Sequence, residues 1–356
     1  MKSSRTISFS SAPRWPRILP PKATDPGPSF NYQELLQAQT NLTAAGVAAY
    51  SLEQVDKIID RLGHPIGLAA YQPYQSSGED YLHNYMGMIG VPIDLHPDFP
   101  TNAALILLTE SAKVDLDLVP KIKDHLQAGG SVIVTSGLLR ALQDRGLQDI
   151  AEVRCTERRF HAHQYASGFG AGDFSAFDNV TNADVLFPEI DFLTNDSWAL
   201  VRAESNANGF PLLLMNRYGR GVLYVWTVPD NFTDLYALPP PVTSAIKKFF
   251  LRGFPVRLDG PAQIGLFAYD NQTFIVESFL PVETDATLGL LGNASRIKNL
   301  VTGDVVDGKT PHHNQWEQRN SLTEDRVTFK IHILPHSYTA FAIEPASQKG
   351  STGSSQ

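Results

Sequence analysis

Residues 131–142, SVIVTSGLLRAL, join a continuously apolar strand directly to a helix. The strand lacks alternation of polar and apolar residues, so we expect it to be buried on both faces, as in a parallel sheet. The junction between such a strand and a helix is where an α/β enzyme often carries its nucleophile. Ser136 stands at this junction, but neither a Gly-x-Ser-x-Gly motif nor a cysteine is present there. The segment therefore predicts a catalytic scaffold without its usual nucleophile.

Apolar and amphipathic segments alternate on both sides of this junction. Continuous apolar strands that alternate with helices indicate a parallel sheet covered on both faces. We therefore predict a doubly wound, flavodoxin-like α/β domain. It should close with a hairpin around residues 218–221 and a last helix that ends at Gly253. The expected strands are 66–71, 91–96, 103–109 and 131–136, and the expected helices are 34–46, 51–63, 78–90, 117–129 and 240–253.

The pattern changes after Pro255, where short β-type segments separated by turn signals replace the alternation. About seven such segments in roughly 90 residues predict a small antiparallel β-sandwich. We place the α/β domain at residues 31–254 and the all-β sandwich domain at 255–345. Residues 1–30 are rich in proline and residues 346–356 have the composition of a linker, so both ends are expected to be disordered.

The charge balance and the cysteine count narrow the classes of partner and compartment. The net charge is −8 and the pI is near 5.7, whereas binders of nucleic acid or anionic membranes need clustered lysine and arginine. No run of about 18 apolar residues is present, so no membrane span is predicted. Cys155 is the only cysteine, which excludes an intrachain disulfide and favours a reducing compartment. Because the first 30 residues also lack the apolar run of a signal peptide, we predict a cytoplasmic protein.

No motif in the chain predicts a cofactor or a metal. The glycines of residues 167–172, SGFGAG, lack the flanking strand and helix of a dinucleotide fingerprint, so a surface loop is preferred. His161 and His163 would share one face of a strand as a possible metal pair, beside Arg158 and Arg159. No carboxylate lies in register with them, so no metal is predicted. A loop of the second domain carries His312, His313 and Trp316, of which the tryptophan is a candidate for glycan stacking or an interface.

The order of these parts resembles the C-terminal half of multidomain bacterial glycoside hydrolases. The resemblance is to β-galactosidases in which a catalytic barrel precedes a trimerisation domain and a small β domain. It rests on residues 104–137, with their strand, helix, Ala-Gly-Gly turn and strand, and on residues 216–231. It implies a class I glutamine amidotransferase-like fold for the first domain and covers about residues 60–345. The matching C-terminal segments are 274–280, 299–306 and 334–345.

The resemblance carries no activity with it. In those enzymes the acid and nucleophile carboxylates lie on the barrel, and this chain has no (β/α)8 pattern. A glutaminase needs a cysteine with a histidine and a carboxylate. Cys155 follows the charged segment 149–154 and does not stand at a junction between a strand and a helix, so no amidotransferase nucleophile is predicted.

The segment YQPYQSSGEDYLHNYMGMIG is the best candidate for a ligand site. It follows a buried strand and opens a helix, so Ser76 and Ser77 should lie at the carboxyl edge of the sheet, near helix N-terminal amides. Glu79 and Asp80 are expected in the first turn of that helix, where each negative charge stabilises the helix by about 0.3 to 1 kcal/mol. In the alternative interpretation, one of them contacts a sugar hydroxyl or acts as a base, with His83 one turn further along.

Further polar groups are expected at the same edge of the sheet. Glu110, between Thr109 and Ser111, ends a buried strand at the edge that also carries Ser136. Together with Glu79, these groups would converge on one pocket. The candidate catalytic residues are Glu79, His83, Glu110 and Ser136.

Aromatic residues near this edge allow two interpretations. Tyr71, Tyr74, Tyr81 and Tyr85 form either a stacking platform for a saccharide ring or ordinary core packing. Asp230 and Asn231 follow another strand, although a turn after Pro229 explains them without a ligand. The candidate ligand-binding residues are Tyr74, Ser76, Ser77, Glu79, Asp80, Asp230 and Asn231.

Three functions remain open. The first is a noncatalytic assembly or accessory module of a carbohydrate-active protein, acting as a homo-oligomer or with a partner glycosidase chain. It predicts an exposed apolar patch on the α/β domain. The second is a stand-alone hydrolase of a sugar derivative, which requires Glu79 and Glu110 to face one concave pocket. The third is a sugar-binding module without chemistry.

Overall fold

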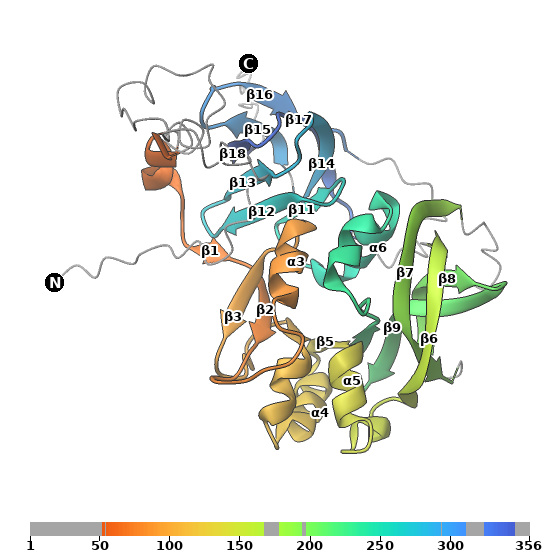
Figure 1. Cartoon of the computed structure of the whole chain (residues 1–356). Helices are drawn as coiled ribbons and strands as arrows, with labels where there is room; N and C mark the ends of the chain where they lie inside the picture. The colour runs from red at the N-terminus through yellow and green to blue at the C-terminus, as the bar shows by residue number, and fades with distance from the viewer. Residues whose placement is uncertain are drawn as a thin grey trace, which may run out of the picture.

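The computed structural model describes residues 52–53, 55–166, 178–193, 197–292, 294–310 and 324–345 (Figure 1). This part of the chain is mostly β and contains sheets of nine, six and three strands. The expected helix at 34–46 and the disordered ends at 1–30 and 346–356 lie outside the described residues. Of the expected helix at 51–63, the described part ends in a 3-10 turn, η1 (Ile59–Arg61).

The nine-stranded sheet has the order β3-β2-β4-β5-β10-β9-β8-β6-β7. Its first five strands are parallel, and its last four are joined by antiparallel pairing. The parallel strands are β3 (Ile93–His96), β2 (Leu68–Tyr71), β4 (Leu105–Leu108), β5 (Ser131–Thr135) and β10 (Gly221–Trp226). The antiparallel strands are β9 (Asn208–Tyr218), β8 (Ser197–Ser205), β6 (Val153–Ala166) and β7 (Asn179–Phe192).

The prediction of a flavodoxin-like, doubly wound parallel sheet for residues 31–254 is therefore wrong for the domain as a whole. Residues 153–218 add long antiparallel strands instead of further helix-strand units. The cause is visible in β6, where Phe160 and Ala162 are buried and the histidines beside them are exposed. That alternation is typical of an antiparallel strand with one buried face.

Helices cover both faces of the parallel part of the sheet. On one face lie α3 (Leu82–Met88) and α6 (Pro240–Phe250), where Phe250 packs edge-on against Trp226 of β10 with ring centroids 5.2 Å apart. On the other lie α4 (Leu118–Ala128) and α5 (Ser136–Leu142). Short 3-10 segments complete the connections: η2 (Glu110–Val114), η3 (Leu147–Asp149) and η4 (Phe232–Ala237).

The C-terminal strands form two sheets packed face to face, which is a β-sandwich arrangement (Figure 1). Their common core contains Leu288 and Phe329 from the smaller sheet and Phe274 and Phe341 from the larger one. The smaller sheet consists of β11 (Val256–Asp259), β14 (Thr284–Leu290) and β17 (Val327–Ile333). The larger consists of β1 (Pro65–Ile66), β12 (Ile264–Tyr269), β13 (Thr273–Ser278), β18 (Tyr338–Pro345), β15 (Ala294–Asn299) and β16 (Val305–Asp307).

Two buried cations connect α6 to the sandwich. The ammonium group of Lys247, which is 1% exposed, donates to the carbonyl oxygen of Leu258 in β11. Arg326 donates to the carbonyl oxygens of Leu251, just after α6, at 2.8 Å and of Gly289 in β14 at 3.1 Å. Because buried cations are costly unless they are hydrogen-bonded, these contacts fix where α6 meets the two strands.

Lys247 should make the stability of the chain depend on alkaline pH. Burial lowers the pKa of Lys247 to about 8, and Asp259 only partly offsets this effect. Between pH 8 and the usual lysine pKa, the unfolded chain binds a proton at this site and the folded chain does not. The free energy of unfolding should therefore rise with pH over this range, by up to about 1.4 kcal/mol per pH unit.

Urea unfolding at a series of pH values measures this rise. Lys247→Met should weaken it and leave the contribution of Lys248, whose pKa burial also lowers. Lys330→Met, at an exposed position of β17, should retain the full rise. An equal pH dependence in wild type and Lys247→Met would contradict the assignment.

Candidate functional site

The loop of residues 72–81, between β2 and α3, has an unusual backbone. Gln75, Glu79 and Tyr81 have φ values of 57°, 49° and 69°, and Gly78 has a φ of 131°. Left-handed backbone costs a residue with a side chain about 1 to 2 kcal/mol. Three such residues in one short loop therefore require contacts that hold the loop in place.

The carboxylate of Glu79 supplies these contacts. Its Oε2 accepts hydrogen bonds from the backbone N–H of Glu110 at 2.8 Å and from the hydroxyl of Thr135. Its Oε1 accepts one from the backbone N–H of Gly137 at 3.1 Å. Glu79 thus joins the segments that follow β2, β4 and β5. Burial raises the pKa of the Glu79 carboxyl above its ordinary value, although its hydrogen bonds oppose that shift.

Glu79 lies at the N-terminus of α5. Thr135 is the N-cap of this helix, and its hydroxyl accepts the N–H of Leu138 at 3.3 Å while donating to Glu79. Gly137 leaves room for the carboxylate, since a Cβ there would lie 2.4 Å from Oε1 of Glu79. A negative charge is favourable next to the unpaired amides of a helix start. The sequence Thr-Ser-Gly of residues 135–137 was the signal for this arrangement.

The predicted position of Glu79 and Asp80 in the first turn of their own helix is wrong. Helix α3 begins only at Leu82, its N-cap Tyr81 is left-handed, and its first turn contains no acidic residue. The left-handed backbone from Gly78 onward delays the helix and turns Glu79 towards α5. Asp80 remains exposed and accepts the N–H of Gly78 at 3.3 Å.

The hydroxyl and thiol groups of this region are buried. Ser136 is 3% exposed, and its Oγ accepts the N–H of Val228 at 3.0 Å. Cys155 is buried in β6, where Nη2 of Arg140 lies 3.2 Å from its sulfur. Both side chains therefore hold neighbouring elements together.

The remaining catalytic candidates have separate partners. The carboxylate of Glu110 accepts a hydrogen bond from Lys113 at 2.7 Å. The backbone N–H of Glu110 donates to the carboxylate of Glu79, so the two glutamates are neighbours. Burial lowers the pKa of His83 to about 4, which makes its ring neutral at pH 7. Within the described ranges, the Nε2 of His83 has no hydrogen-bond partner.

The four tyrosines divide into two pairs. Tyr71 is buried, donates to Asp115 at 3.0 Å and packs edge-on against Phe99. Tyr85 packs against aromatic side chains of η4. By contrast, Tyr74 and Tyr81 are 80% and 74% exposed. The first pair is core packing, and only the second is available to a ligand.

The other candidate ligand-binding residues have local structural contacts. The hydroxyl of Ser76 donates to the carbonyl of Pro73 at 2.6 Å, and Ser77 is exposed. Asp230 forms an ion pair with Arg159 at 2.7 Å. Asn231 is the N-cap of η4 and accepts the N–H of Thr233 at 3.2 Å. Thr109 and Ser111 share a buried hydroxyl contact of 2.9 Å.

The histidines of β6 do have a carboxylate neighbour, which spacing alone could not reveal. Asp184 of β7 lies 2.9 Å from Nδ1 of His161 and 3.3 Å from Nε2 of His163. Arg158 of β6 forms an ion pair with Glu189, which lies on β7 as Asp184 does. No group of metal-binding geometry is present in the part of the chain that the structure describes. The glycines of 167–172 and the loop residues His312, His313 and Trp316 lie outside the described residues.

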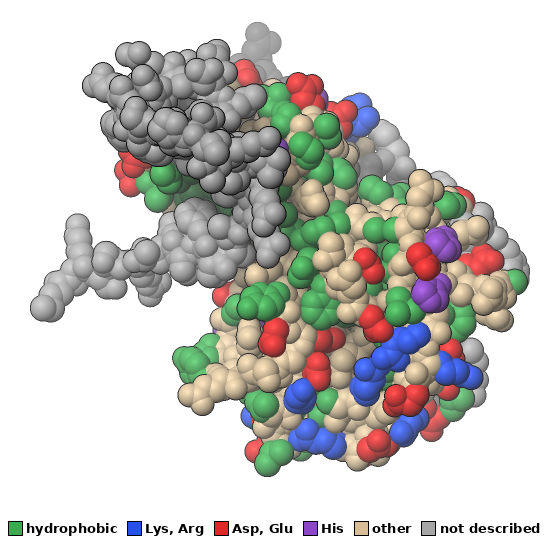
Figure 2. Space-filling model, in the orientation of Figure 1, with side chains coloured by type: hydrophobic (Ala, Val, Ile, Leu, Met, Phe, Trp, Pro, Cys, Tyr) green, Lys and Arg blue, Asp and Glu red, His purple; other side chains and the backbone are tan. Residues whose placement is uncertain are grey.

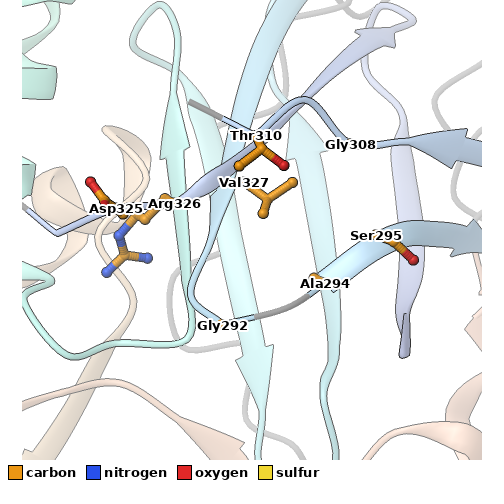
Figure 3. A pocket seen from close by; sticks show the side chains of 8 residues that line it. All are labelled: Gly292, Ala294, Ser295, Gly308, Thr310, Asp325, Arg326 and Val327. Atoms are coloured by element: carbon orange, nitrogen blue, oxygen red, sulfur yellow. The ribbon is translucent and has the colours of Figure 1, made fainter. Parts of the chain in front are cut away.

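Two hollows on the surface of the described residues are lined by neither Glu79 nor Glu110. One, of about 400 Å³, lies in the sandwich (Figure 3) and is lined by Gly292, Ala294, Ser295, Gly308, Thr310, Asp325, Arg326 and Val327. The other, of about 500 Å³, is lined by Gln148, Glu152, Val153, Arg154, Asp191, Phe192 and Leu193. On the face in Figure 2, acidic and basic side chains intermingle and no large field of one sign develops. No helix of the described ranges is long and apolar enough to cross a membrane.

Comparison with known families finds a match for the C-terminal β-sandwich and a second match for part of the preceding domain. Residues 255–343 match the family described as "Probable glycosyl hydrolase, C-terminal domain". This segment is thus similar to the C-terminal domains of glycosyl hydrolases. Residues 63–231 match the family described as "Uncharacterized protein SSO3021, second domain". No curated protein matches the chain.

Similar solved structures include β-galactosidases. The enzyme from Bacillus circulans sp. alkalophilus has a TM-score of 0.47 and 12% identity, over 84% of this chain and 44% of that one. The enzyme from the haloarchaeon Halorubrum lacusprofundi has a TM-score of 0.45 and 14% identity, over 85% of this chain and 42% of that one. The chain thus aligns with less than half the length of these β-galactosidases.

Proposed function

We propose that the chain is a noncatalytic assembly or accessory module of a glycoside hydrolase-like protein. In this proposal, the part of the chain around the five parallel strands acts like the class I glutamine amidotransferase-like trimerisation domain of those β-galactosidases and joins subunits. The observation that carries the proposal is that two of the four candidate catalytic groups, Glu79 and Ser136, are used internally. Glu79 accepts three hydrogen bonds, and Ser136 is buried against Val228.

A catalytic group needs access to its substrate. A general acid, base or nucleophile must come within hydrogen-bond reach of the substrate. Both carboxylate oxygens of Glu79 already accept donors from the protein, and moving the carboxylate would leave those donors unpaired. Glu79 instead connects the segments that follow β2, β4 and β5, which favours a structural role for it.

Exposed apolar side chains on the α/β part support assembly. Tyr74 and Tyr81 project from the loop after β2, Leu95 lies on the edge strand β3, and Leu116 lies between η2 and α4; all four are exposed. These positions lie at or beyond the carboxyl ends of β2, β3 and β4, so the carboxyl edge of the sheet is the proposed docking region.

Light scattering after size-exclusion chromatography tests the assembly role. The wild-type chain should run as an oligomer, and the double change Tyr81→Glu with Leu116→Glu should shift it towards the monomer. A matched control is Val282→Glu, which places the same charge at an exposed apolar position before β14. A monomeric wild type would reject self-assembly.

The absence of catalysis is tested by assaying aryl galactosides and a panel of other aryl glycosides. The expected rate is that of buffer alone.

A second candidate, a hydrolase of a sugar derivative, is favoured by the adjacent glutamates and by burial that raises the pKa of Glu79. Turnover that disappears in Glu110→Gln would establish that candidate and reject the noncatalytic role.

A further inference from the structure

The chain is unusually rich in the tripeptide Asn-x-Ser/Thr. Six of its sixteen asparagines are followed two positions later by serine or threonine, without proline between. With 47 serines and threonines in 356 residues, about two such tripeptides are expected by chance. This tripeptide is the acceptor sequence for N-linked oligosaccharides and is usable where it lies in a surface loop. The six asparagines are Asn41, Asn179, Asn195, Asn231, Asn271 and Asn293.

Asn231 is exposed at a turn. It follows β10 and precedes η4, and its Oδ1 accepts the backbone N–H of Thr233, the third residue of its tripeptide, at 3.2 Å. Its Nδ2 has only a long contact of 3.4 Å with Asp234. A group added to this nitrogen would displace little of the folded structure.

Asn271 lies in the hairpin turn between β12 and β13 and is also exposed. Its Oδ1 accepts both the N–H of Thr273 at 3.3 Å and the hydroxyl of Thr273 at 2.6 Å. Its Nδ2 donates to the carbonyl oxygen of Arg61 at 2.9 Å. An amide nitrogen has two hydrogens, so a glycosylated nitrogen would keep one for Arg61.

Asn179 differs from both. It is the first residue of β7 and is only partly exposed. Its Nδ2 donates to the carbonyl oxygen of Tyr165 at 3.3 Å and to Asp178 at 3.1 Å, beside the pairing of β6 with β7. Both amide hydrogens are engaged, so a glycan on this nitrogen would break a contact at the strand pair.

We propose that Asn231 and Asn271 are acceptor sites for N-linked oligosaccharide and that Asn179 is not. In the transfer, Nδ2 forms a bond to C1 of the first sugar of a polyprenyl-diphosphate oligosaccharide. The nitrogen loses one proton, and the bond from C1 to the diphosphate breaks, releasing polyprenyl diphosphate. The proposal requires export of the chain, in opposition to the cytoplasmic location that the single cysteine favours. It does not depend on the assembly role.

The test is production of the full chain behind a cleavable secretory leader in eukaryotic cells. The secreted, folded protein is treated with peptide N-glycosidase in water enriched in heavy oxygen, which labels each asparagine that carried a glycan. The labelled peptides are then identified by mass spectrometry. Label is expected at Asn231 and Asn271 and not at Asn179. Thr233→Ala and Thr273→Ala, which leave the asparagines in place, should each lower the intact mass by one glycan.

Asn299→Gln is the matched control. Asn299 makes a similar turn, since its Oδ1 accepts the N–H of Val301 at 2.9 Å, but it lacks a hydroxyl residue two positions on. Its replacement should leave the glycan mass unchanged. If secretion fails, translation with microsomes gives the same answer from gel mobility. Absence of label at both Asn231 and Asn271, or label at Asn179 in folded protein, would overturn the proposal.

Discussion

Gly137→Ala is expected to lower the free energy of unfolding by about 2 to 4 kcal/mol, although alanine is the better helix former. The added Cβ would lie 2.4 Å from Oε1 of Glu79. The carboxylate is the flexible end of a side chain and can swing away. It then leaves the N–H of Glu110, the hydroxyl of Thr135 and the N–H of Gly137 without their acceptor. Urea unfolding monitored by tryptophan fluorescence measures the loss.

Gly87→Ala is the matched control for this change. Gly87 lies inside α3, and a Cβ there would meet nothing within 4 Å. Its replacement should stabilise the chain by about 0.5 to 1 kcal/mol through helix propensity alone. In a double-mutant cycle, Gly137→Ala should cost much less in a Glu79→Ala background, because the contact is already lost. Equal stability of the two glycine variants would show that Glu79 does not hold α5.

The parallel strands and the major helices could be predicted from the sequence, because their signals are local. Apolar runs such as 131–135 and stop signals such as Gly129, left-handed after α4, depend on neighbouring residues only. The antiparallel strands β6, β7 and β8 were not predicted, although the hairpin of β9 and β10 around residues 218–221 was. The 14 residues of β6 are rich in charged residues and histidines, so this strand lacks the continuous apolar run that marks the parallel strands.

The candidate site shows a similar division. The expectation that Glu79, Glu110 and the residues after β5 meet at one sheet edge follows from parallel strands, and the structure places them in contact. The sequence could not predict the direction in which the Glu79 side chain points. Its partners lie 31 to 58 residues away, and its left-handed backbone is a property of the folded loop. The pairing of Asp184 with two histidines of β6 is equally non-local.

Arg326→Met is expected to be as damaging as any single change, at about 3 to 5 kcal/mol. The guanidinium is 4% exposed and donates to the carbonyls of Leu251 and Gly289 and to the carboxylate of Glu324 at 2.9 Å. Methionine retains the apolar stem but removes the buried donor from the carbonyls of Leu251 and Gly289 and from the carboxylate of Glu324. Leu251 then keeps only the N–H of Phe254, and Glu324 keeps the N–H of Gly253. Because these contacts join α6 to the sandwich, limited proteolysis should cleave the variant between the two parts faster than wild type.

Arg220→Met tests whether the loss of an exposed arginine destabilises the chain as much as the loss of the buried Arg326. Arg220 also donates to two backbone carbonyls at a helix end, those of Gln127 and Ala128, but it is exposed. Water replaces exposed partners, so its removal should cost no more than about 1 kcal/mol. Adding Glu324→Gln to Arg326→Met should recover part of the loss, since it removes the negative charge that has lost its cationic partner. Similar costs for the two arginine variants would mean that burial at the junction contributes nothing. A larger cost for Arg326→Met, with recovery by the second change, would establish the buried guanidinium as the connection that sets the sandwich against α6.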